Sequence, residues 1–381
     1  MSVKPMRLGM FMMPLHPAHR APSVTLEEDR EAVMLADRLG FHDAFVGEHL
    51  TEKSENVTNS FIFLATLIHA TKQIRLGSGT SNLSHTHPTL IASHAAMFDH
   101  MARGRFIFGI SPGALSSDAE ALGMLSEDRN KLFAESIDVI LEIWKRNAPY
   151  DIDLPGNRFK VTTAKTSVPE IERGEMYKPY QLPRPEIVGT VVAPFSKGVI
   201  AMGERDFHPL SANFLLSRFL KSHWTNYEQG KRNAGQVADV ADWRIARTIF
   251  VADDEATARR YAIESLDSPY RYYWNLLLKK MMLSKRHAIF KESESQSDAE
   301  LTIEYMLDRL VLWGTPERVA QRILALREEA GPFGEIVYAN MDWVDPVMAR
   351  RSIELMATEV MPRVNAAITG STAAPTTTRA A

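Results

Sequence analysis

The stretch from Phe41 to His49 constrains the fold of this chain most. It is apolar through its middle and ends abruptly at an acid and an imidazole. Two further stretches, 74–82 and 105–113, are built in the same way and end in small or polar residues. Helical patterns separate the three stretches, and strands that alternate with helices form parallel βαβ units. When several parallel strands end in polar residues, those ends are where we expect the chemistry.

The alternation of strands and helices continues along the chain. Eight stretches are predicted to be strands: 6–14, 41–49, 74–82, 105–113, 186–192, 207–212, 243–252 and 335–341. Each has its own predicted helix, and this count indicates an α/β fold of the (β/α)8 TIM-barrel class, which exceeds about 250 residues when loops carry insertions. A doubly wound sheet is the alternative. It usually has a glycine-rich first βα turn, whereas Pro14-Leu-His-Pro17 stands there in this chain.

Helix boundaries are predicted from capping residues and from apolar spacing. Thr25 is expected to cap the first helix, and Gly40 follows its end. Thr315 is expected to cap a later helix, with Pro316 in its first turn. The predicted helices cover 26–39, 59–70, 88–101, 127–144, 197–203, 217–231, 254–266, 316–329 and 346–364.

Two irregular stretches interrupt the pattern of one predicted domain over 1–369. The first, near 148–185, is rich in proline, and we expect it to pack over the face where the strands end. The second, near 268–300, carries an aromatic cluster at 270–274 that either lines a substrate lid or forms a packing face. The tail 370–381 consists mainly of Ser, Thr, Ala and Pro and is expected to be disordered.

Composition excludes several classes of function. The net charge of −3 gives no reason to expect nucleic acid or an anionic membrane as a partner. The chain has no cysteine, which excludes disulfides, thiolate metal sites and cysteine nucleophiles. No apolar run approaches the roughly 20 residues that a membrane span needs, and the start lacks a signal-peptide core. We therefore expect a cytoplasmic protein.

Three motifs, in this order and spacing, resemble the bacterial-luciferase-like flavin monooxygenases. They are Gly40-Phe-His-Asp-Ala-Phe-Val-Gly-Glu-His49, Asn82-Leu-Ser-His-Thr-His-Pro88 and Arg103-Gly-Arg-Phe-Ile-Phe-Gly109. The resemblance extends over about 6–364. A later segment, Gly203-Glu-Arg-Asp-Phe-His-Pro-Leu-Ser211, is similar to the subgroup with limonene 1,2-monooxygenase and the diketocamphane monooxygenases.

The resemblance implies a cofactor, partners and a reaction. Reduced FMN (FMNH2) comes from a separate NAD(P)H-dependent flavin reductase, and dioxygen adds to it to give a C4a-hydroperoxide. One oxygen atom then passes to a small apolar substrate, such as a terpene or a cyclic ketone. The family habit is a homodimer through early barrel helices. Phe61, Phe63 and Leu64 suit that interface, although they fit a core position equally well.

His49 is the catalytic residue that the resemblance implies, because it matches the imidazole of the family's Glu-His motif. An imidazole can carry a proton near neutral pH, which suits general acid–base catalysis. The alternative is a histidine buried and hydrogen-bonded at a strand end. Glu48 precedes it and points the other way in a straight strand, so we expect it to tie barrel loops together.

The predicted FMN-binding residues lie at strand ends. The Asn82 amide suits the polar edge of an isoalloxazine ring, and the family often has a non-prolyl cis peptide here, at Gly79-Thr80 or Thr80-Ser81. Ser196 and Lys197 are expected at the phosphate, or Ser196 merely caps a helix. Luciferases have an arginine where this chain has Pro112, which removes one phosphate partner. The full predicted set is Gly79, Thr80, Asn82, Ser111, Gly113, Val192, Ser196 and Lys197.

Other chemistries are weaker alternatives. A deazaflavin-dependent oxidoreductase that transfers hydride, or a protein that only holds flavin, would share the architecture. His85-x-His87 resembles a metal pair but lacks a carboxylate pattern such as HExxH, so we predict no metal site. Additional histidines in the loops at strand ends are pocket candidates, namely His16, His19 and His223.

Overall fold

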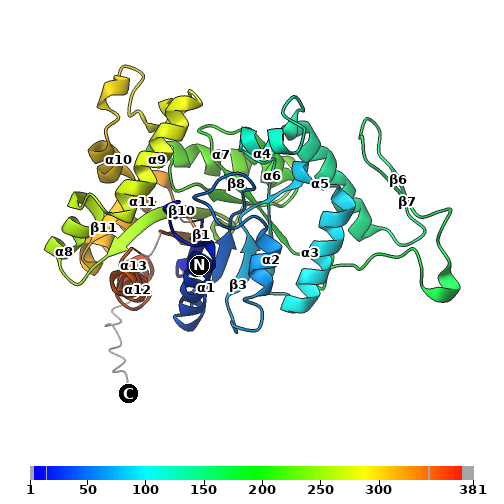
Figure 1. The fold of residues 1–381 in the computed structure, drawn as a ribbon, viewed down its shortest axis with the longest axis horizontal. Helices are drawn as coiled ribbons and strands as arrows, with labels where there is room; N and C mark the ends of the chain where they lie inside the picture. Colours follow the sequence, from blue (N-terminus) through cyan, green and yellow to red (C-terminus); the bar gives the residue numbers. More distant parts are fainter. Residues whose placement is uncertain (1–3, 14, 342–343, 371–381) are drawn as a thin grey trace. The chain divides into compact units, whose positions relative to one another are not determined.

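The computed structural model describes residues 4–13, 15–341 and 344–370 (Figure 1). Eight parallel strands form a closed barrel with flanking helices, which confirms the predicted (β/α)8 fold. Their order around the barrel is β1-β2-β3-β5-β8-β9-β10-β12, and β12 pairs with β1. They span Arg7–Met12 (β1), Asp43–Val46 (β2), Arg75–Ser78 (β3), Phe106–Ser111 (β5), Glu186–Val191 (β8), His208–Ser211 (β9), Arg244–Val251 (β10) and Glu335–Asn340 (β12).

The chain divides into two units, 1–44 with 190–381 (unit 1) and 45–189 (unit 2). The first contains α1 (Pro22–Arg38), α6 (Gly198–Glu204), α7 (Ser217–Asn233), α8 (Glu255–Arg259), α9 (Pro269–Leu283), α10 (Ile303–Leu310), β11 (Val311–Gly314), α11 (Pro316–Ala330), α12 (Pro346–Leu355) and α13 (Met361–Thr369). The second contains α2 (Ser60–Ala65), β4 (Ser81–Asn82), α3 (Pro88–Ala102), α4 (Ser116–Ala121), α5 (Arg129–Lys145), β6 (Asp151–Asp153) and β7 (Lys160–Thr162).

In unit 1, a buried cluster of charges joins the starts of four strands. The Arg244 guanidinium at the start of β10 lies 3.1 Å from Asp43 Oδ2 and 3.4 Å from Glu335 Oε2. Arg7 Nε lies 3.2 Å from the same Glu335 oxygen. Gly9 leaves room for the carboxylates, because a Cβ there would lie 2.3 Å from Glu335 Oε1. The cluster therefore fixes how β1, β2, β10 and β12 begin.

The two acidic groups of this cluster, Asp43 and Glu335, lie close together in a buried place. Burial and the nearby Asp43 raise the pKa of the Glu335 carboxyl well above its usual range, although Arg244 and Arg7 act against that rise. The buried Arg244 cation is paired with both of these acidic groups, at 3.1 Å from Asp43 and 3.4 Å from Glu335. A buried charge without such a partner would be destabilising by several kcal/mol, roughly 3–5.

The stretch 268–300 in unit 1, predicted to be irregular, is helical in its first half, where α9 covers Pro269–Leu283. Ser268 caps α9 by accepting a hydrogen bond from the Tyr270 N–H at 3.2 Å. Tyr270, Tyr273 and Trp274 are buried in an apolar cluster that also includes residues of α10 and β11. In Figure 1, α9 and α10 are the neighbouring yellow helices. The aromatic residues at 270–274 thus serve mainly as a packing face.

In unit 2, β3 and β5 approach each other unusually closely. Ser78 Oγ donates to Gly109 O at 2.8 Å and accepts from Gly109 N at 3.0 Å. A Cβ on Gly109 would lie 1.8 Å from the Ser78 carbonyl oxygen. Gly109 is therefore required by the contact between the two backbones.

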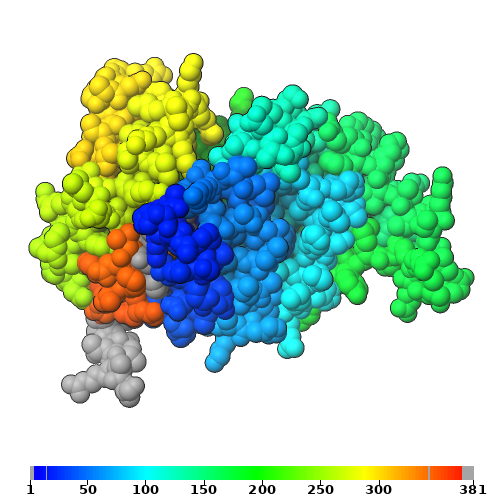
Figure 2. Space-filling view, in the orientation of Figure 1, coloured from blue at the N-terminus to red at the C-terminus, as the bar shows by residue number. Residues whose placement is uncertain are grey.

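The excursion at 148–185 has its base at the strand starts, whereas its hairpin turn reaches toward the strand-end side that we predicted, since Arg158 Nη2 donates to Glu127 Oε2 at 2.8 Å just before the start of α5. It follows the carboxyl end of α5, and Lys178 Nζ donates to Ile143 O of that helix at 2.9 Å. Gln181 donates to both Asp99 oxygens, each at 2.8 Å, near the end of α3. Helices that follow parallel strands run back toward the strand starts, so these two contacts place the base of the excursion there. Its hairpin, β6 and β7, projects beyond α3 and α5 (Figures 1 and 2).

Most predicted helix boundaries agree with the structure within a few residues, but the caps differ. Thr315 accepts a hydrogen bond from Arg318 N, as predicted for the cap of α11. Thr25 lies inside α1, which starts at Pro22, so its predicted role as a cap is wrong. Short α4 and β11 were not predicted.

None of the helices in the described ranges has the length and apolarity needed to cross a lipid bilayer. The cytoplasmic location and the single domain over 1–369 stay predictions. The predicted tail 370–381 lies outside the described residues, apart from Gly370.

We expect Gly109→Ala to reduce the free energy of unfolding by about 3 kcal/mol, because β3 and β5 must separate to admit the methyl group. Urea unfolding followed by circular dichroism measures this change. Gly198→Ala is the control, since the nearest atom to a Cβ there is Ser196 Oγ at 3.5 Å. Equal stability of the two variants would contradict the proposed close contact.

Candidate active site

His49 lies just beyond the end of β2, between two carboxylates of unit 2. Its Nδ1 lies 3.1 Å from Asp118 Oδ2, and its Nε2 lies 3.2 Å from Glu55 Oε2. The side chain is 13% exposed. Asp118 is buried and Glu55 nearly so. The imidazole is therefore fixed in orientation, and each of its nitrogens has an acidic neighbour.

Asp118, on the short helix α4, is held by several donors besides His49. Its Oδ1 accepts from Leu50 N at 3.2 Å, from Thr51 N at 2.8 Å and from Thr51 Oγ1 at 2.5 Å. Burial alone would raise the pKa of Asp118, but the hydrogen bonds from Thr51 and His49 hold it below its usual value. Asp118 is thus a carboxylate at neutral pH and a fixed acceptor for His49.

Glu48 ties two loops of unit 2 together, as the sequence predicted. Its Oε2 accepts from Ser60 N at 2.9 Å and from Ser60 Oγ at 2.8 Å. Its Oε1 accepts from Asn82 N at 3.0 Å. Glu48 therefore connects the start of α2 to the end of β4 while the next residue, His49, points toward Asp118.

Four of the predicted cofactor-binding residues form one hydrogen-bonded group. Thr80 Oγ1 donates to Ser111 Oγ at 2.6 Å, and Ser111 Oγ donates to Asn82 Oδ1 at 2.9 Å. Gly113 N also donates to Ser111 Oγ, at 3.3 Å. Ser111 is therefore the centre of the group. Because Asn82 Nδ2 donates to Glu48 O at 3.3 Å, both ends of the Asn82 amide already have partners.

The backbone at the end of β3 contains the predicted non-prolyl cis peptide. It lies at Gly79-Thr80, the first of the two positions that we considered. Gly113, at the end of β5, has a φ of +79°, and a Cβ there would lie 2.6 Å from His85 Nε2. Only glycine suits this position, because φ is positive and the imidazole is close.

Two buried polar atoms beside this group have no hydrogen-bond partner within the part of the chain that the structure describes. They are Ser81 Oγ and His85 Nε2. Burial lowers the pKa of His85, and nearby Asp118 only partly offsets this, so the ring is neutral at physiological pH. Arg129 lies close by and donates to Gly113 O at 3.0 Å and to Leu115 O at 3.1 Å. Ser81 Oγ and His85 Nε2 can therefore still form hydrogen bonds with a ligand.

The remaining predicted residues, Val192, Ser196 and Lys197, lie in unit 1 between β8 and α6. Phe195 N donates to Ser222 Oγ at 3.2 Å, and Asn226 Nδ2 donates to Ser196 O at 2.8 Å. Lys197 is the residue that caps α6, without a side-chain hydrogen bond. Ser196 therefore does not act as the plain helix cap that was its alternative role.

His223 on α7 holds the loop between β8 and α6 through a chain of hydrogen bonds. Its Nε2 lies 3.0 Å from Ala193 O, so this nitrogen carries the proton and donates. Its Nδ1 then accepts from Ser211 Oγ at 2.9 Å, and Ser211 Oγ accepts from Trp243 Nε1 at 2.9 Å. Burial, together with the Arg247 charge, lowers the pKa of His223 to about 4. His223 is thus a neutral structural histidine and not an open pocket residue.

The other histidines are accounted for separately. His16 is buried with its Nε2 3.1 Å from Asp29 Oδ2, and His19 lines a cleft of unit 1. His87 accepts from Thr89 N at the start of α3. Among the described residues, the one group with metal-ligand spacing is His42, Asp43 and Glu335. Since Arg244 already contacts both carboxylates, we assign no metal to it.

The residues around His49, Asp118 and Glu55, could not be predicted from the sequence. Asp118 lies 69 positions further along the chain and Glu55 lies in an irregular loop, so no local pattern connects them to His49. The one signal for Asp118 is that it is an acidic residue near the start of α4, a helix that follows the end of a strand. The sequence pattern around His85 suggests a metal ligand, and Arg129 lies within a predicted helix, so neither pattern indicates a place beside the strand ends.

Comparison with known proteins places the chain among oxygenases. A family model described as "Luciferase-like monooxygenase" matches residues 6–332. The 4-hydroxyprotoasukamycin monooxygenase of Streptomyces nodosus subsp. asukaensis is 29% identical over 96% of this chain and 94% of its own length. Limonene 1,2-monooxygenase of Rhodococcus erythropolis is 30% identical over 94% and 86%. The oxygenase component of a flavin-dependent trigonelline monooxygenase from Acinetobacter baylyi is 26% identical over 88% and 89%.

Solved structures agree with these relatives. The oxygenating constituent of 3,6-diketocamphane monooxygenase of Pseudomonas putida, in complex with FMN, superposes with a TM-score of 0.85. It is 25% identical, and the match covers 95% of this chain and 99% of that one. An F420-dependent secondary alcohol dehydrogenase has a TM-score of 0.69 at 18% identity over 95% and 99%, which shows a shared fold alone.

The low pKa of His223 predicts how stability depends on pH. The pKa of His223 is about 4 in the folded state and 6.5 in the unfolded state. Between pH 4 and pH 6.5, His223 therefore takes up a proton when the protein unfolds. The stability that neutral His223 contributes is therefore complete above pH 6.5 and is lost as the pH falls toward 4, by about 3 kcal/mol in total. Urea unfolding at a series of pH values measures this loss.

The variant His223→Gln should show a smaller decline over that pH range, whatever its absolute stability. His69→Gln is the matched control, since His69 is exposed, and its curve should parallel the wild type. An unchanged slope in His223→Gln would show that His223 titrates normally.

Proposed function

Because the chain belongs to the luciferase-like monooxygenase family and is a flavin-dependent monooxygenase, we propose that it works as the oxygenase of a two-component system. It takes reduced FMN from a separate flavin reductase and oxygenates a small apolar substrate of the terpene or cyclic-ketone class. The trigonelline relative is described as an oxygenase component. The FMN in the diketocamphane structure belongs to a relative that this chain resembles over 95% of its length.

The polar atoms at the strand ends of unit 2 fit a flavin. Ser81 Oγ and His85 Nε2 are buried with unused hydrogen-bonding capacity, and an isoalloxazine ring has both donors and acceptors at its edge. The surface beside these atoms leaves space for a ring, because the residues there carry small side chains or none, namely Gly79, Thr80, Ser111 and Gly113. Reduced FMN would supply the electrons that activate dioxygen. Asn82 acts through Ser111 and Glu48, since its own amide is engaged.

The arrangement around His49 carries the proposed proton chemistry. Asp118 accepts at Nδ1, so Nε2 is the nitrogen that can exchange a proton with a ligand. Glu55 Oε2, at 3.2 Å from Nε2, provides a nearby carboxylate with which that nitrogen interacts when no ligand is bound. An imidazole oriented by a buried carboxylate in this way is an efficient general acid or base. The phosphate role of Ser196 and Lys197 and the contact at Val192 stay predictions.

The first test is stopped-flow absorbance after the protein with FMNH2 is mixed with oxygenated buffer. We expect a transient near-ultraviolet band that is distinct from oxidised FMN, because the protein excludes water from the site. Direct reoxidation at the rate of free FMNH2 would contradict the monooxygenase proposal. It would turn attention to the deazaflavin oxidoreductase and to the protein that only holds flavin.

Variants at His49 and Asp118 separate proton chemistry from binding in the same experiment. We expect His49→Asn to slow the proton-dependent decay of the transient by at least about 100-fold and to flatten its pH profile. Asp118→Asn should give a smaller effect in the same direction, because it loosens the imidazole without removing it. His69→Gln again serves as the control. A wild-type pH profile in His49→Asn would exclude His49 as the proton carrier.

We propose that the protein is a homodimer through the outer faces of α2 and α3. Phe63 and Leu64 occupy the core position that was their alternative, and half-buried Phe61 packs on Phe98 and Phe106. The exposed apolar side chains on these helices are different ones. They are Ile62, Leu90, Met97 and Met101.

The spacing of the residues on α3 supports this proposal, because positions 90, 97 and 101 lie on one helix face. We expect Met97→Glu combined with Ile62→Lys to give monomers in sedimentation velocity. Val237→Lys is the control, since Val237 is an exposed apolar residue in a distant part of the sequence. A wild-type protein that sediments as a monomer would contradict the proposed dimer.

A further inference from the structure

The loop between β2 and α2 folds back onto the residue near its start, His49. The His49 N–H donates to Val57 O at 3.0 Å, and this hydrogen bond closes the loop. Inside the loop, the Glu55 N–H donates to Glu52 O at 2.9 Å, and Ser54 Oγ donates to Glu52 Oε1 at 2.7 Å. These hydrogen bonds bring Glu55 back beside the His49 ring.

The Glu55 carboxylate meets the imidazole in a place that solvent hardly reaches. Its Oε2 lies 3.2 Å from His49 Nε2, and the side chains of Glu55 and His49 are 8% and 13% exposed. Opposite charges interact more strongly in such surroundings than they do in water. Burial disfavours a charged imidazole and a neighbouring carboxylate favours it, so the carboxylate decides whether the ring nitrogen keeps a proton.

The other charged and titratable groups near the imidazole act elsewhere. Asp118 is on the opposite side of the ring, where several donors fix its carboxylate as the acceptor for Nδ1. His85 interacts electrostatically with His49, but its own ring is neutral because burial lowers its pKa. The Arg129 guanidinium donates to two backbone carbonyls. Within the described ranges, Glu55 is therefore the charged group in contact with Nε2.

We propose that Glu55 is a positioning residue whose carboxylate raises the proton affinity of His49 Nε2, so that the ligand-free site holds a proton to donate. When a ligand binds, that proton passes from Nε2 to a basic atom of the ligand, and the electron pair of the N–H bond stays on the nitrogen. Glu55 keeps its charge throughout, and solvent returns the proton afterwards. The inference rests on the proposed function for the role of His49, and on the loop geometry for the role of Glu55.

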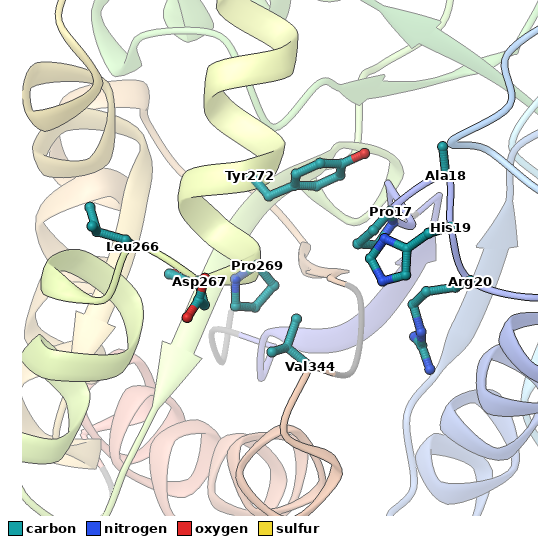
Figure 3. Close-up of a pocket in the computed structure, with 10 residues that line it drawn as sticks. Pro17, Ala18, His19, Arg20, Leu266, Asp267, Pro269, Tyr272 and Val344 are labelled. Atoms are coloured by element: carbon teal, nitrogen blue, oxygen red, sulfur yellow. The ribbon is translucent and has the colours of Figure 1, made fainter.

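The test uses the full chain without flavin and with ¹⁵N-labelled histidine rings, followed by NMR over a range of pH. The His49 signals are assigned by their loss in His49→Asn. We expect Glu55→Gln to lower the proton affinity of Nε2 by about 10-fold or more, because the attraction between the two charges is lost. His19, which is exposed at a cleft of unit 1 (Figure 3), serves as the internal reference in every spectrum.

Two further variants separate the charge of Glu55 from a role in supporting the loop. Glu55→Asp keeps the charge with a shorter side chain, so it should retain more of the wild-type proton affinity than Glu55→Gln, which keeps the shape. Glu120→Gln is the matched control, because Glu120 is an exposed acid on α4, and it should leave the titration of His49 unchanged. The opposite order of the Gln and Asp variants, or equal proton affinities in the wild type and Glu55→Gln, would overturn the proposal.

Stopped flow connects this result to turnover. In Glu55→Gln, the pH profile for decay of the transient should move to lower pH by the same factor that NMR measures for Nε2. A wild-type protein that gives no transient would contradict the proposed function, while the NMR titration, which needs no flavin, still decides the role of Glu55. A wild-type transient with an unchanged NMR titration in Glu55→Gln would overturn this inference alone.

Discussion

One buried arginine, Arg244, holds together the starts of the strands in unit 1. Its guanidinium contacts Asp43 on β2 and Glu335 on β12, and Gly9 on β1 leaves the space that their carboxylates need. A cation in a dry interior is tolerated only when it is paired. The pairing therefore fixes the register in which these strands begin.

The strand ends of unit 2 are held together by a group of hydrogen bonds and not by a buried arginine. Here Ser111, Asn82 and Glu48 use nearly all of their polar capacity on one another. Such a satisfied group is rigid. It leaves the two unsatisfied atoms, Ser81 Oγ and His85 Nε2, as the places where a bound molecule gains hydrogen bonds. Neighbouring side chains of the same short segments thus have different roles, because some hold the structure rigid and others can bind a ligand.

Apolar periodicity was sufficient to predict the barrel, its eight strands and most helices, because each burial pattern is local. The partners of His49 were not predictable in this way, since Asp118 is brought to it by the fold across 69 positions. The base of the excursion at 148–185 was misplaced for another reason. Its proline content says nothing about which end of the strands it covers, whereas its position between a helix and the following strand does. The segment 203–211, which is similar to the limonene and diketocamphane subgroup, ends at Ser211, and Ser211 bonds His223, so this resemblance has a structural basis.

The hairpin of β6 and β7 has a practical consequence. It lies against α5, where Asn157 Nδ2 donates to Glu135 O at 2.9 Å, and its turn at 154–159 contains Gly156 with open space around it. A short peptide tag or a fluorescent label inserted in this turn would leave His49 and its partners in place. The same turn gives evolution a position where the chain can lengthen, or acquire a new partner, while the chemistry stays constant.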